Sequence, residues 1–402
     1  MYVNSISITL FRMPNATTVL HQLQHLLPLD EFQNFVNLKK ADKYTKKLGC
    51  KDQLTILLYA QATGKNSLRE IETALKIQDS TWYHLGIETV ARSTLGAANK
   101  KRPYGIYESL FYELLKKCKG FSFGTATFSF ENDLYAIDAT TINLCLALFP
   151  WAHFRTEKGA IKLHTLFNVR NQIPELILVT DGKSADITMV KKMGLKKLAL
   201  GSIITFDRGY NDYGFLYSIH EAKHTFVARL KDDAHILSLE SFAVTEKGVL
   251  KDERIGFVLE KALKDYPEDL RLVTYHDDVH NVTYHFLTNN FEFSAKIIAD
   301  IYKARWQIEL FFKWIKQHLK IKTFLGTSKN AVLTQIWVAM IYYLLLAWIK
   351  FQTKFKGTLL DLTWIIKEML LRNISIINLL NLSQKTASLV ASRAGPSQLS
   401  LL

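Results

Sequence analysis

A helical pattern runs from Ile301 to Lys320 without a Pro or Gly. At about 100° per residue, it separates an apolar face from a polar face that is mostly basic. The apolar face consists of Ile301, Ile308, Phe311, Phe312, Ile315 and Leu319, and the polar face of Tyr302, Arg305, Glu309, Lys313 and Lys316. We expect the apolar face to pack on a core. The lone carboxylate of Glu309 either forms i,i+4 ion pairs on a solvated face or binds a metal among phosphate-binding cations.

The first 119 residues show further helical patterns and few strand signals. A segment from Val19 to Leu29 is weakly periodic, and Asp52 can cap a helix that ends before Gly64. A capping box at Ser67 begins another helix, and two more are predicted near residues 93–102 and 104–119. This spacing fits a helix-turn-helix DNA reader and a plain helical bundle equally well.

After residue 121 the pattern changes to short β-branched and aromatic runs. They predict strands at Leu134–Leu146, Ile161–Val169, Ile173–Thr180, Ser202–Asp207 and Thr225–Leu230, with a helix at Asp186–Leu198. Short reversals near residues 158–159 and 171–172 predict antiparallel hairpins. Residues 231–295 alternate like strands again and are interpreted as an inserted β-rich subdomain. We therefore expect an α/β protein with a mixed sheet and three domains, at 1–125, 126–330 and 331–402.

Residues 331–349 form a run of nineteen residues without a charge. This length is close to that of a membrane-spanning helix. The run contains Thr334 and Gln335, and the chain has no second candidate, so a buried core helix is favoured over a membrane span.

The net charge of +14 and the pI of about 9.4 indicate a polyanionic partner. Nucleic acid is the default, and an anionic membrane surface is the second choice. The charge is concentrated in two regions: residues 1–130 carry 17 Lys and Arg against 10 Asp and Glu, and residues 296–356 carry 11 against 2. Six lysines at residues 39–51 form a candidate phosphate-binding patch. Cys50, Cys118 and Cys145 lack metal or disulfide spacing, which favours reduced thiols and a cytoplasmic location.

Two aspartates lie in otherwise apolar strand patterns. Asp138 follows Ala136-Ile137, and Asp207 follows the Ile203–Phe206 run, two residues before Gly209. A carboxylate in such a strand is costly unless it is paired or bound to metal. Three carboxylates from two strands and the Glu309 helix can hold the two divalent ions required for in-line phosphodiester cleavage.

The spacing Tyr302-x2-Arg305-x3-Glu309-x6-Lys316 resembles the YREK signature of DDE-type insertion-sequence transposases of the insertion-sequence-four-like family. Asp138-Ala-Thr140 and Asp207-Arg-Gly-Tyr also resemble the family's first and second acidic motifs. The resemblance covers roughly residues 35–330. It implies an RNase H-like catalytic domain, an inserted β subdomain and an N-terminal domain that binds terminal inverted repeats.

The resemblance also implies roles for particular residues. Asp138, Asp207 and Glu309 would be catalytic ligands of two Mg²⁺ or Mn²⁺ ions. Trp306 would either stack on a displaced base or, as we favour, pack in the core. The expected DNA-binding residues are Tyr302, Arg305, Lys313, Lys316, Lys320, Arg208, Lys162, His164, Lys39, Lys40, Lys43, Lys46, Lys47 and Arg102. Lys162 and His164 would either line the DNA channel or lie at the surface of a hairpin.

The function that follows is cut-and-paste DNA transposition. The chain would bind double-stranded DNA at the terminal inverted repeats and at a target, as a homodimer on paired ends, without a membrane partner. Two alternatives remain open: an RNase H-like nuclease without strand transfer, and a catalytically inactive derivative that only binds DNA.

Overall fold

The computed structural model describes residues 17–119, 128–155, 158–231 and 234–382. The chain divides into two compact units. The helical unit comprises residues 1–123 and 315–402, and the sheet unit comprises residues 124–314. The predicted boundary at residue 125 lies outside the described residues. The later division falls between Trp314 and Ile315, within helix α13 (Trp306–His318).

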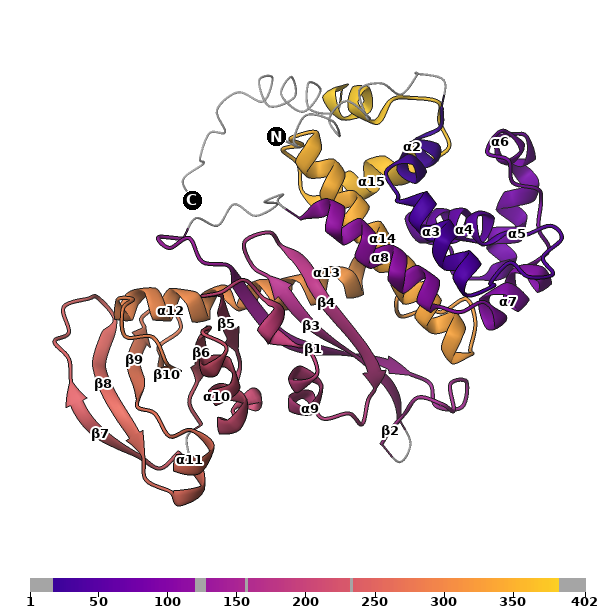
Figure 1. Ribbon diagram of the computed structural model, residues 1–402. Coiled ribbons are helices and arrows are strands. Elements are labelled where there is room, and N and C mark those ends of the chain that lie inside the picture. Colours follow the sequence, from indigo (N-terminus) through magenta and orange to yellow (C-terminus); the bar gives the residue numbers. More distant parts are fainter. Residues whose placement is uncertain (1–16, 120–127, 156–157, 232–233, 383–402) are drawn as a thin grey trace, which may run out of the picture. The chain divides into compact units, whose positions relative to one another are not determined.

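The helical unit is built around α14 (Lys329–Gln352), in which every residue from Ala331 to Ile349 is buried. Around it pack α4 (Cys50–Thr63), α7 (Arg92–Lys101), α8 (Gly105–Cys118) and α15 (Leu359–Met369) (Figure 1). The remaining helices are α2 (Val19–His25), α3 (Leu29–Leu38), α5 (Leu68–Ile77) and α6 (Asp79–His84). Within the described chain, α14 is the one helix long and apolar enough to cross a membrane, and its apolar window is wholly buried.

The predicted helix starts and ends in the helical unit agree closely with the structure. Gly64 ends α4 in the left-handed conformation, with φ of +72°. Ser67 caps α5, because its side chain accepts a hydrogen bond from the Glu70 backbone N–H. Asp52 lies at the third position of α4 and accepts a hydrogen bond from the Gly49 N–H, so it stabilises the start of the helix from within the first turn and is not itself the N-cap.

The sheet unit contains one mixed sheet of ten strands, in the order β2-β3-β1-β5-β6-β10-β9-β8-β7, with β4 paired to β3 (Figure 1). Strands β1, β5 and β6 are parallel, and the other pairs are antiparallel. The strands are β1 (Leu134–Leu144), β2 (His153–Arg155), β3 (Lys158–Asn168), β4 (Ile173–Asp181), β5 (Ile203–Phe206), β6 (Thr225–Arg229), β7 (Ile236–Ser241), β8 (Val249–Phe257), β9 (Leu270–Asp277) and β10 (Val282–Thr288).

The predicted inserted β-rich segment extends this sheet. Strand β10 pairs with β6, so the sheet continues from the parallel strands into β9, β8 and β7 without a break in hydrogen bonding. Strand β7 was not predicted from the sequence. Its alternating Leu and polar residues lie on the edge of the sheet, where most of its side chains are exposed.

Helices cover both faces of the sheet. Helices α9 (Asp186–Lys191), α10 (Tyr213–Glu221) and α11 (Glu260–Asp265) contribute to one apolar cluster with residues of β1, β5, β6 and β8–β10. Helix α12 (Ala295–Ala304) packs against β5, β6, β8, β9 and β10, and its buried residues are absent from that cluster. It therefore covers the other face. Short 3-10 turns occupy Leu195–Lys197 and Arg208–Tyr210.

The helix predicted from Ile301 to Lys320 is two helices. Helix α12 ends at Ala304, Arg305 is its C-cap, and α13 begins at Trp306. The break contains no Gly or Pro, so no local pattern predicts it. Arg305 lies just before the start of α13 and Glu309 lies in its first turn, and both belong to the sheet unit.

Candidate active site

Asp138 and Asp207 lie at the same level of two neighbouring parallel strands. The paired residues Ile137 of β1 and Phe206 of β5 come immediately before them. Both of these apolar residues belong to the cluster under α9 and α10. Because side chains alternate along a strand, Asp138 projects to the opposite face, which is the face covered by α12. The next position after β5 brings Asp207 beside it.

Helix α13 brings Glu309 to this face. Phe311 of α13 stacks on Phe167 of β3, with ring centroids 5.1 Å apart. Ile308 and Phe312 are also buried, so the predicted apolar face of the helix packs on the sheet unit. Glu309 lies on the other side of α13 and keeps 31% of its side chain exposed.

Arg305 joins Glu309 to Asp138. Its Nη2 lies 2.7 Å from Glu309 Oε1, and its Nη1 lies 3.9 Å from Asp138 Oδ2. Burial disfavours the charged guanidinium, but Tyr302, Glu309 and Asp138 outweigh this effect and raise the pKa of Arg305. The guanidinium also lies over the Tyr302 ring, 5.4 Å from its centroid. Arg305 is therefore held in the site as a cation.

The site raises the pKa of Asp138 to about 6. Burial is the main cause, and the nearby carboxylates of Asp207 and Glu309 add to it, while the Ala139 N–H and Arg305 oppose it. A half-buried carboxylate next to two others is an environment that a bound cation would stabilise. Carboxylate oxygens are also the ligands that Mg²⁺ prefers, so the donor set fits such an ion.

The three acids do not form a closed metal site as they stand. Across the described ranges, no group of three or more His, Cys, Asp or Glu side chains is close enough to hold a metal ion. The Asp207 Oδ1 accepts a hydrogen bond from the Gly209 N–H at 2.8 Å, which caps the turn that follows β5. Arg305 occupies the space between the other two acids.

Two predicted DNA-binding residues of β3 lie on the other face of the sheet. Asp138 pairs with Thr165, whereas Ala139 pairs with His164 and Thr141 with Lys162. His164 is completely buried, with its Nε2 2.9 Å from Thr180 Oγ1, and burial lowers its pKa to about 4. Lys162 donates a hydrogen bond to Asp186 Oδ1 at 2.9 Å. The prediction that these two side chains line a DNA channel is corrected, because period-two alternation turns both toward α9.

One of the five other predicted residues near the site has different surroundings from those expected. Trp306 is 54% exposed, so the favoured interpretation as a core residue is wrong. Tyr302 is half-buried against Phe286, with ring centroids 4.7 Å apart. Burial raises the pKa of its phenol, and the phenol also interacts with Arg305 and Asp207. Arg208 is exposed in the turn after Asp207, and Lys313 is exposed on α13. Lys316 is half-buried.

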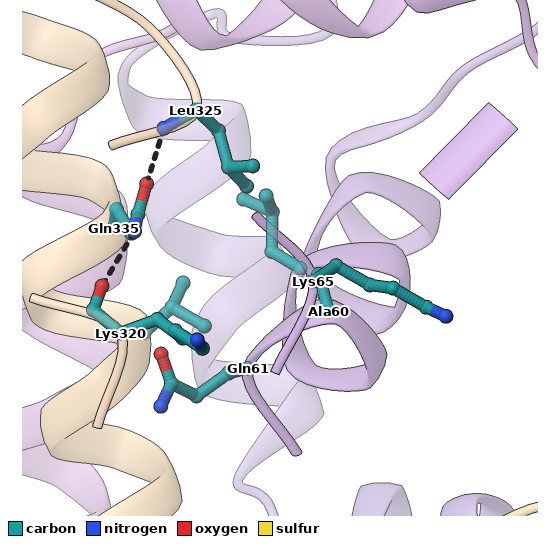
Figure 2. A pocket seen from close by; sticks show the side chains of 8 residues that line it. Ala60, Gln61, Lys65, Lys320, Leu325 and Gln335 are labelled. Carbon is teal, nitrogen blue, oxygen red and sulfur yellow. Dashed lines mark hydrogen bonds between the residues drawn. The ribbon is translucent and has the colours of Figure 1, made fainter. Parts of the chain in front are cut away.

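Lys320 is engaged within the helical unit. Its Nζ donates a hydrogen bond to Asn66 Oδ1 at 2.9 Å, and its chain passes close to Gly64. Its carbonyl accepts a hydrogen bond from Gln335 Nε2, and the Gln335 Oε1 accepts one from the Leu325 N–H at 2.8 Å (Figure 2). Lys320 thus contacts the turn after α4, and its expected role as a DNA contact stays a prediction.

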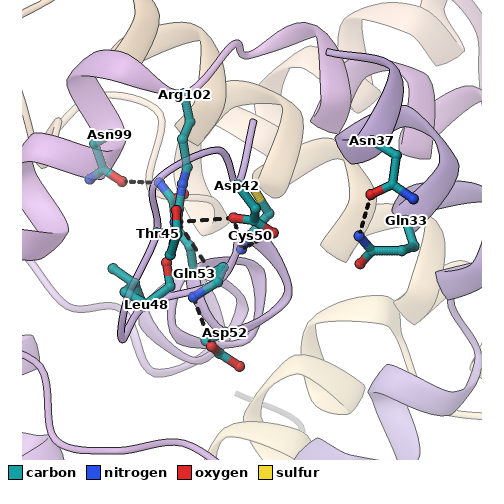
Figure 3. Close-up of polar contacts among 11 residues, drawn as sticks. Gln33, Asn37, Asp42, Thr45, Leu48, Cys50, Asp52, Gln53, Asn99 and Arg102 are labelled. Atoms are coloured by element: carbon teal, nitrogen blue, oxygen red, sulfur yellow. Dashed lines mark hydrogen bonds and ion pairs between the residues drawn. The ribbon is translucent and has the colours of Figure 1, made fainter. Parts of the chain in front are cut away.

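Arg102 is also buried in the helical unit. Only 7% of the residue is exposed, and its guanidinium lies within a loop formed by residues 39–49 (Figure 3). The predicted direct contact of Arg102 with DNA is therefore corrected. The five predicted lysines of that loop, Lys39, Lys40, Lys43, Lys46 and Lys47, are all exposed.

Comparison with known proteins decides the family. Residues 129–345 match the model of the transposase DDE domain, and residues 15–88 match a domain of unknown function. The chain belongs to the DDE transposase family. The first match contains Asp138, Asp207 and Glu309, and the second contains the lysines at residues 39–51.

Relatives from several bacteria support this assignment. The chain is 30% identical over 284 residues to a probable transposase for insertion sequence element IS5377 of Geobacillus stearothermophilus, covering 70% of this chain and 72% of the relative. It is 34% identical over 222 residues to the putative transposase y4zB of Sinorhizobium fredii, covering 53% of this chain and 60% of that one. The structure also matches that of a piggyBac transposase synaptic complex with hairpin DNA. The match covers 98% of this chain and 82% of the piggyBac chain, with 11% sequence identity and a TM-score of 0.47.

Proposed function

We propose that this DDE transposase cuts DNA at the terminal inverted repeats of its insertion sequence and joins the freed 3′ ends to a target. The observation that carries the proposal is the placement of Asp138 and Asp207 after paired residues of adjacent parallel strands, with Glu309 tied to Asp138 through Arg305. This arrangement supports an RNase H-like site of the YREK type.

Asp138, Asp207 and Glu309 would hold two Mg²⁺ or Mn²⁺ ions. When bound, such ions activate the attacking oxygen and stabilise the leaving oxygen of a phosphodiester. The carboxylates supply the negative charge that fixes the ions. The fit rests on the donor set and on the raised pKa of Asp138, which reflects negative charge crowded into a partly buried place.

The cations on and near α13 would position the DNA backbone. Arg305 can donate two hydrogen bonds to one phosphate, which a lysine cannot do in the same plane. Arg208 follows Asp207 directly, and Lys313 lies one helical turn after Glu309. Lys316 and the Tyr302 hydroxyl complete the proposed contacts to phosphates.

The helical unit would bind the terminal repeats, and the protein would act as a homodimer on paired ends. The basic charge of residues 1–130 supports a nucleic-acid partner for this unit. The exposed lysines near residues 39–47 are the clearest candidates for phosphate contacts.

Glu309→Gln tests the chemistry with little change in side-chain volume. We expect the variant to retain binding to a labelled terminal-repeat duplex and to lose Mg²⁺-dependent nicking by at least about 10³-fold, because an amide cannot replace the charged ligand. Glu292→Gln, an exposed glutamate in the same unit, is the matched control. Nicking by Glu309→Gln at the wild-type rate would refute the proposed site.

Two further outcomes distinguish the alternative functions. Wild-type protein that nicks the repeat end but never joins it to a second duplex would be a nuclease without strand transfer. Wild-type protein that binds the repeat and cuts nothing, with Mg²⁺ or Mn²⁺, would be a DNA-binding derivative. The proposed function requires joined products from the wild-type chain.

A further inference from the structure

The buried Arg102 organises an exposed lysine-rich loop in the helical unit. Its Nη1 donates hydrogen bonds to the Gly49 carbonyl at 3.2 Å and to Gln53 Oε1 at 2.8 Å. Its Nη2 lies 3.3 Å from Asp42 Oδ1 and also donates to the Leu48 carbonyl. These contacts fasten both ends and the middle of the loop to one guanidinium (Figure 3).

Hydrogen bonds with residues of α4, α7 and α14 hold Arg102 in place. Gln53, which accepts from Arg102, donates its own amide hydrogen to Asn99 Oδ1 at 2.7 Å. Asn330 of α14 donates to the carbonyls of Asn99 and Arg102. The loop is therefore attached to the core of the helical unit through a continuous set of buried polar contacts.

The loop adopts a backbone conformation that its residues disfavour. Lys40 has a φ of +51° and Tyr44 a φ of +65°, in the left-handed region that side chains with a Cβ rarely occupy. Strain of this kind persists where the surroundings impose it, and it is common at functional sites. Here it leaves the Tyr44 ring 88% exposed, with the Lys43 ammonium 4.8 Å from the ring centroid.

The surface of the loop is positively charged throughout. Asp42 is its single acid, and it is neutralised internally by Arg102 and by the Cys50 N–H. Lys100 and Lys101, next to Arg102 at the end of α7, are exposed as well. We call Lys39, Lys40, Lys43, Lys46, Lys47, Lys100 and Lys101, together with Tyr44, the lysine surface.

We propose that the lysine surface grips the backbone of duplex DNA, with the Tyr44 ring placed in a groove against sugar and base, and that Arg102 is the positioning residue that presets it. The choice of DNA as the ligand rests on the proposed function. The lysine surface would give a role to the region that matches a domain of unknown function. A preset loop binds with less loss of conformational entropy than a mobile one, so its cations contribute more to affinity.

The first test measures how DNA binding depends on salt. In the full-length protein, Lys43→Gln, Lys46→Gln and Lys47→Gln together remove three phosphate contacts. Each lost contact lowers the slope of log K against log salt concentration by about 0.9. We therefore expect the slope to fall by roughly 3, with weaker binding to repeat and non-repeat duplexes alike.

The matched control removes the same charge elsewhere in the helical unit. Lys117→Gln, Lys356→Gln and Lys367→Gln change three exposed lysines outside the lysine surface. We expect the control to retain the wild-type slope. Equal slopes for the two triple variants would overturn the proposal, because only net charge would then matter.

The second test separates the ring and the positioning residue from the charges. Tyr44→Ala is expected to weaken duplex binding roughly tenfold at every salt concentration and to leave the slope unchanged. Arg102→Lys keeps the charge but cannot bridge the loop, so we expect a smaller slope and faster hydrogen exchange at residues 39–49. An unchanged slope in a folded Arg102→Lys protein would refute the positioning role.

Failure of the lysine surface and failure of the proposed function give different experimental results. If the Lys43, Lys46 and Lys47 variant binds DNA weakly but still joins pre-nicked 3′ ends to a target at the normal rate at low salt, the lysine surface is supported independently of the active site. Wild-type protein without cleavage or joining refutes the proposed function but leaves the slope experiment meaningful. Salt-dependent binding to anionic phosphatidylserine vesicles in place of DNA would overturn the choice of partner.

Discussion

Arg305 Nη2 lies 2.7 Å from Glu309 Oε1, while Nη1 of the same guanidinium reaches toward Asp138 at 3.9 Å. A basic side chain thus occupies the space between two acids proposed to bind metal. It reduces the repulsion between the two carboxylates, and it has to be displaced before both can ligate an ion.

Arg305→Gln is expected to increase the affinity of the DNA-free protein for Mn²⁺ by about tenfold or more, because about 1.4 kcal/mol of competing interaction corresponds to a factor of ten. Titration calorimetry or electron paramagnetic resonance of free Mn²⁺ measures the change without any catalytic readout. Lys313→Gln removes an exposed cation of α13, one helical turn after Glu309, and is the control. Equal Mn²⁺ affinity in the wild type and Arg305→Gln would show that Arg305 does not compete with the metal.

Asp138→Asn is expected to stabilise the metal-free fold above pH 6 by about 1–3 kcal/mol. The fold raises the pKa of Asp138 from 3.8 to about 6, so ionisation of this group opposes folding. The destabilisation by the ionised Asp138 is absent below about pH 4, grows as the pH rises toward 6 and is fully present above it. Removing the charge should therefore stabilise the fold at high pH only. Urea unfolding at pH 4 and pH 8 tests it, and a variant less stable than the wild type at pH 8 would contradict it.

His164→Gln is expected to flatten the dependence of stability on pH between about 4 and 6.5. Burial lowers the pKa of His164 to about 4, so the unfolded chain binds its proton first as the pH falls. Wild-type stability should therefore decrease over this range as the pH falls, while Gln retains a hydrogen-bonding group for Thr180 without titrating. Urea midpoints at several pH values provide the measurement, and identical slopes in both proteins would argue against a buried neutral histidine.

Trp306→Ala is expected to weaken binding to terminal-repeat DNA about tenfold, since the exposed ring lies next to Arg305 and stacking on a base contributes about 1–3 kcal/mol. Trp364 is 56% exposed in the helical unit and provides a matched control as Trp364→Ala. Fluorescence anisotropy of labelled DNA measures both. Similar affinity losses in the two variants would indicate a general effect of removing a surface ring.

Gln335→Leu is expected to destabilise the protein by about 2–4 kcal/mol. Gln335 satisfies the carbonyls of Lys320 and Thr323 and the Leu325 N–H, and leucine would leave these groups without a partner. Thermal or urea unfolding measures the loss. Gln317→Leu, at an exposed position of α13, should change stability by less than about 0.5 kcal/mol.

Patterns that depend on local sequence predicted much of the fold. The strands around Asp138 and Asp207 and the caps at Gly64 and Ser67 could be located because alternation and capping act over a few residues. The position of Glu309 near Asp138 came from motif spacing, and the break at Arg305 remained hidden because no Gly or Pro marks it.

Features that depend on distant partners could not be predicted in the same way. Arginine side chains are usually exposed, so the residue type alone places Arg102 at the surface. Only the fold brings Asp42 and Gln53 around it. The direction of His164 requires the register of β3 against β1, because a shift of one residue would turn it to the face of Asp138. Trp306 is exposed because α13 turns its other side to the sheet.

Helix α14, which forms the centre of the helical unit, is synthesised after every other helix that packs around it except α15. Helices α4, α7 and α8 leave the ribosome more than two hundred residues earlier and cannot bury their apolar sides until α14 emerges. Their apolar surface is exposed to chaperones or to aggregation during that interval. A fragment ending before residue 329 should consequently fail to form a stable helical unit, so a premature stop codon there would also disrupt the proposed DNA-binding surface.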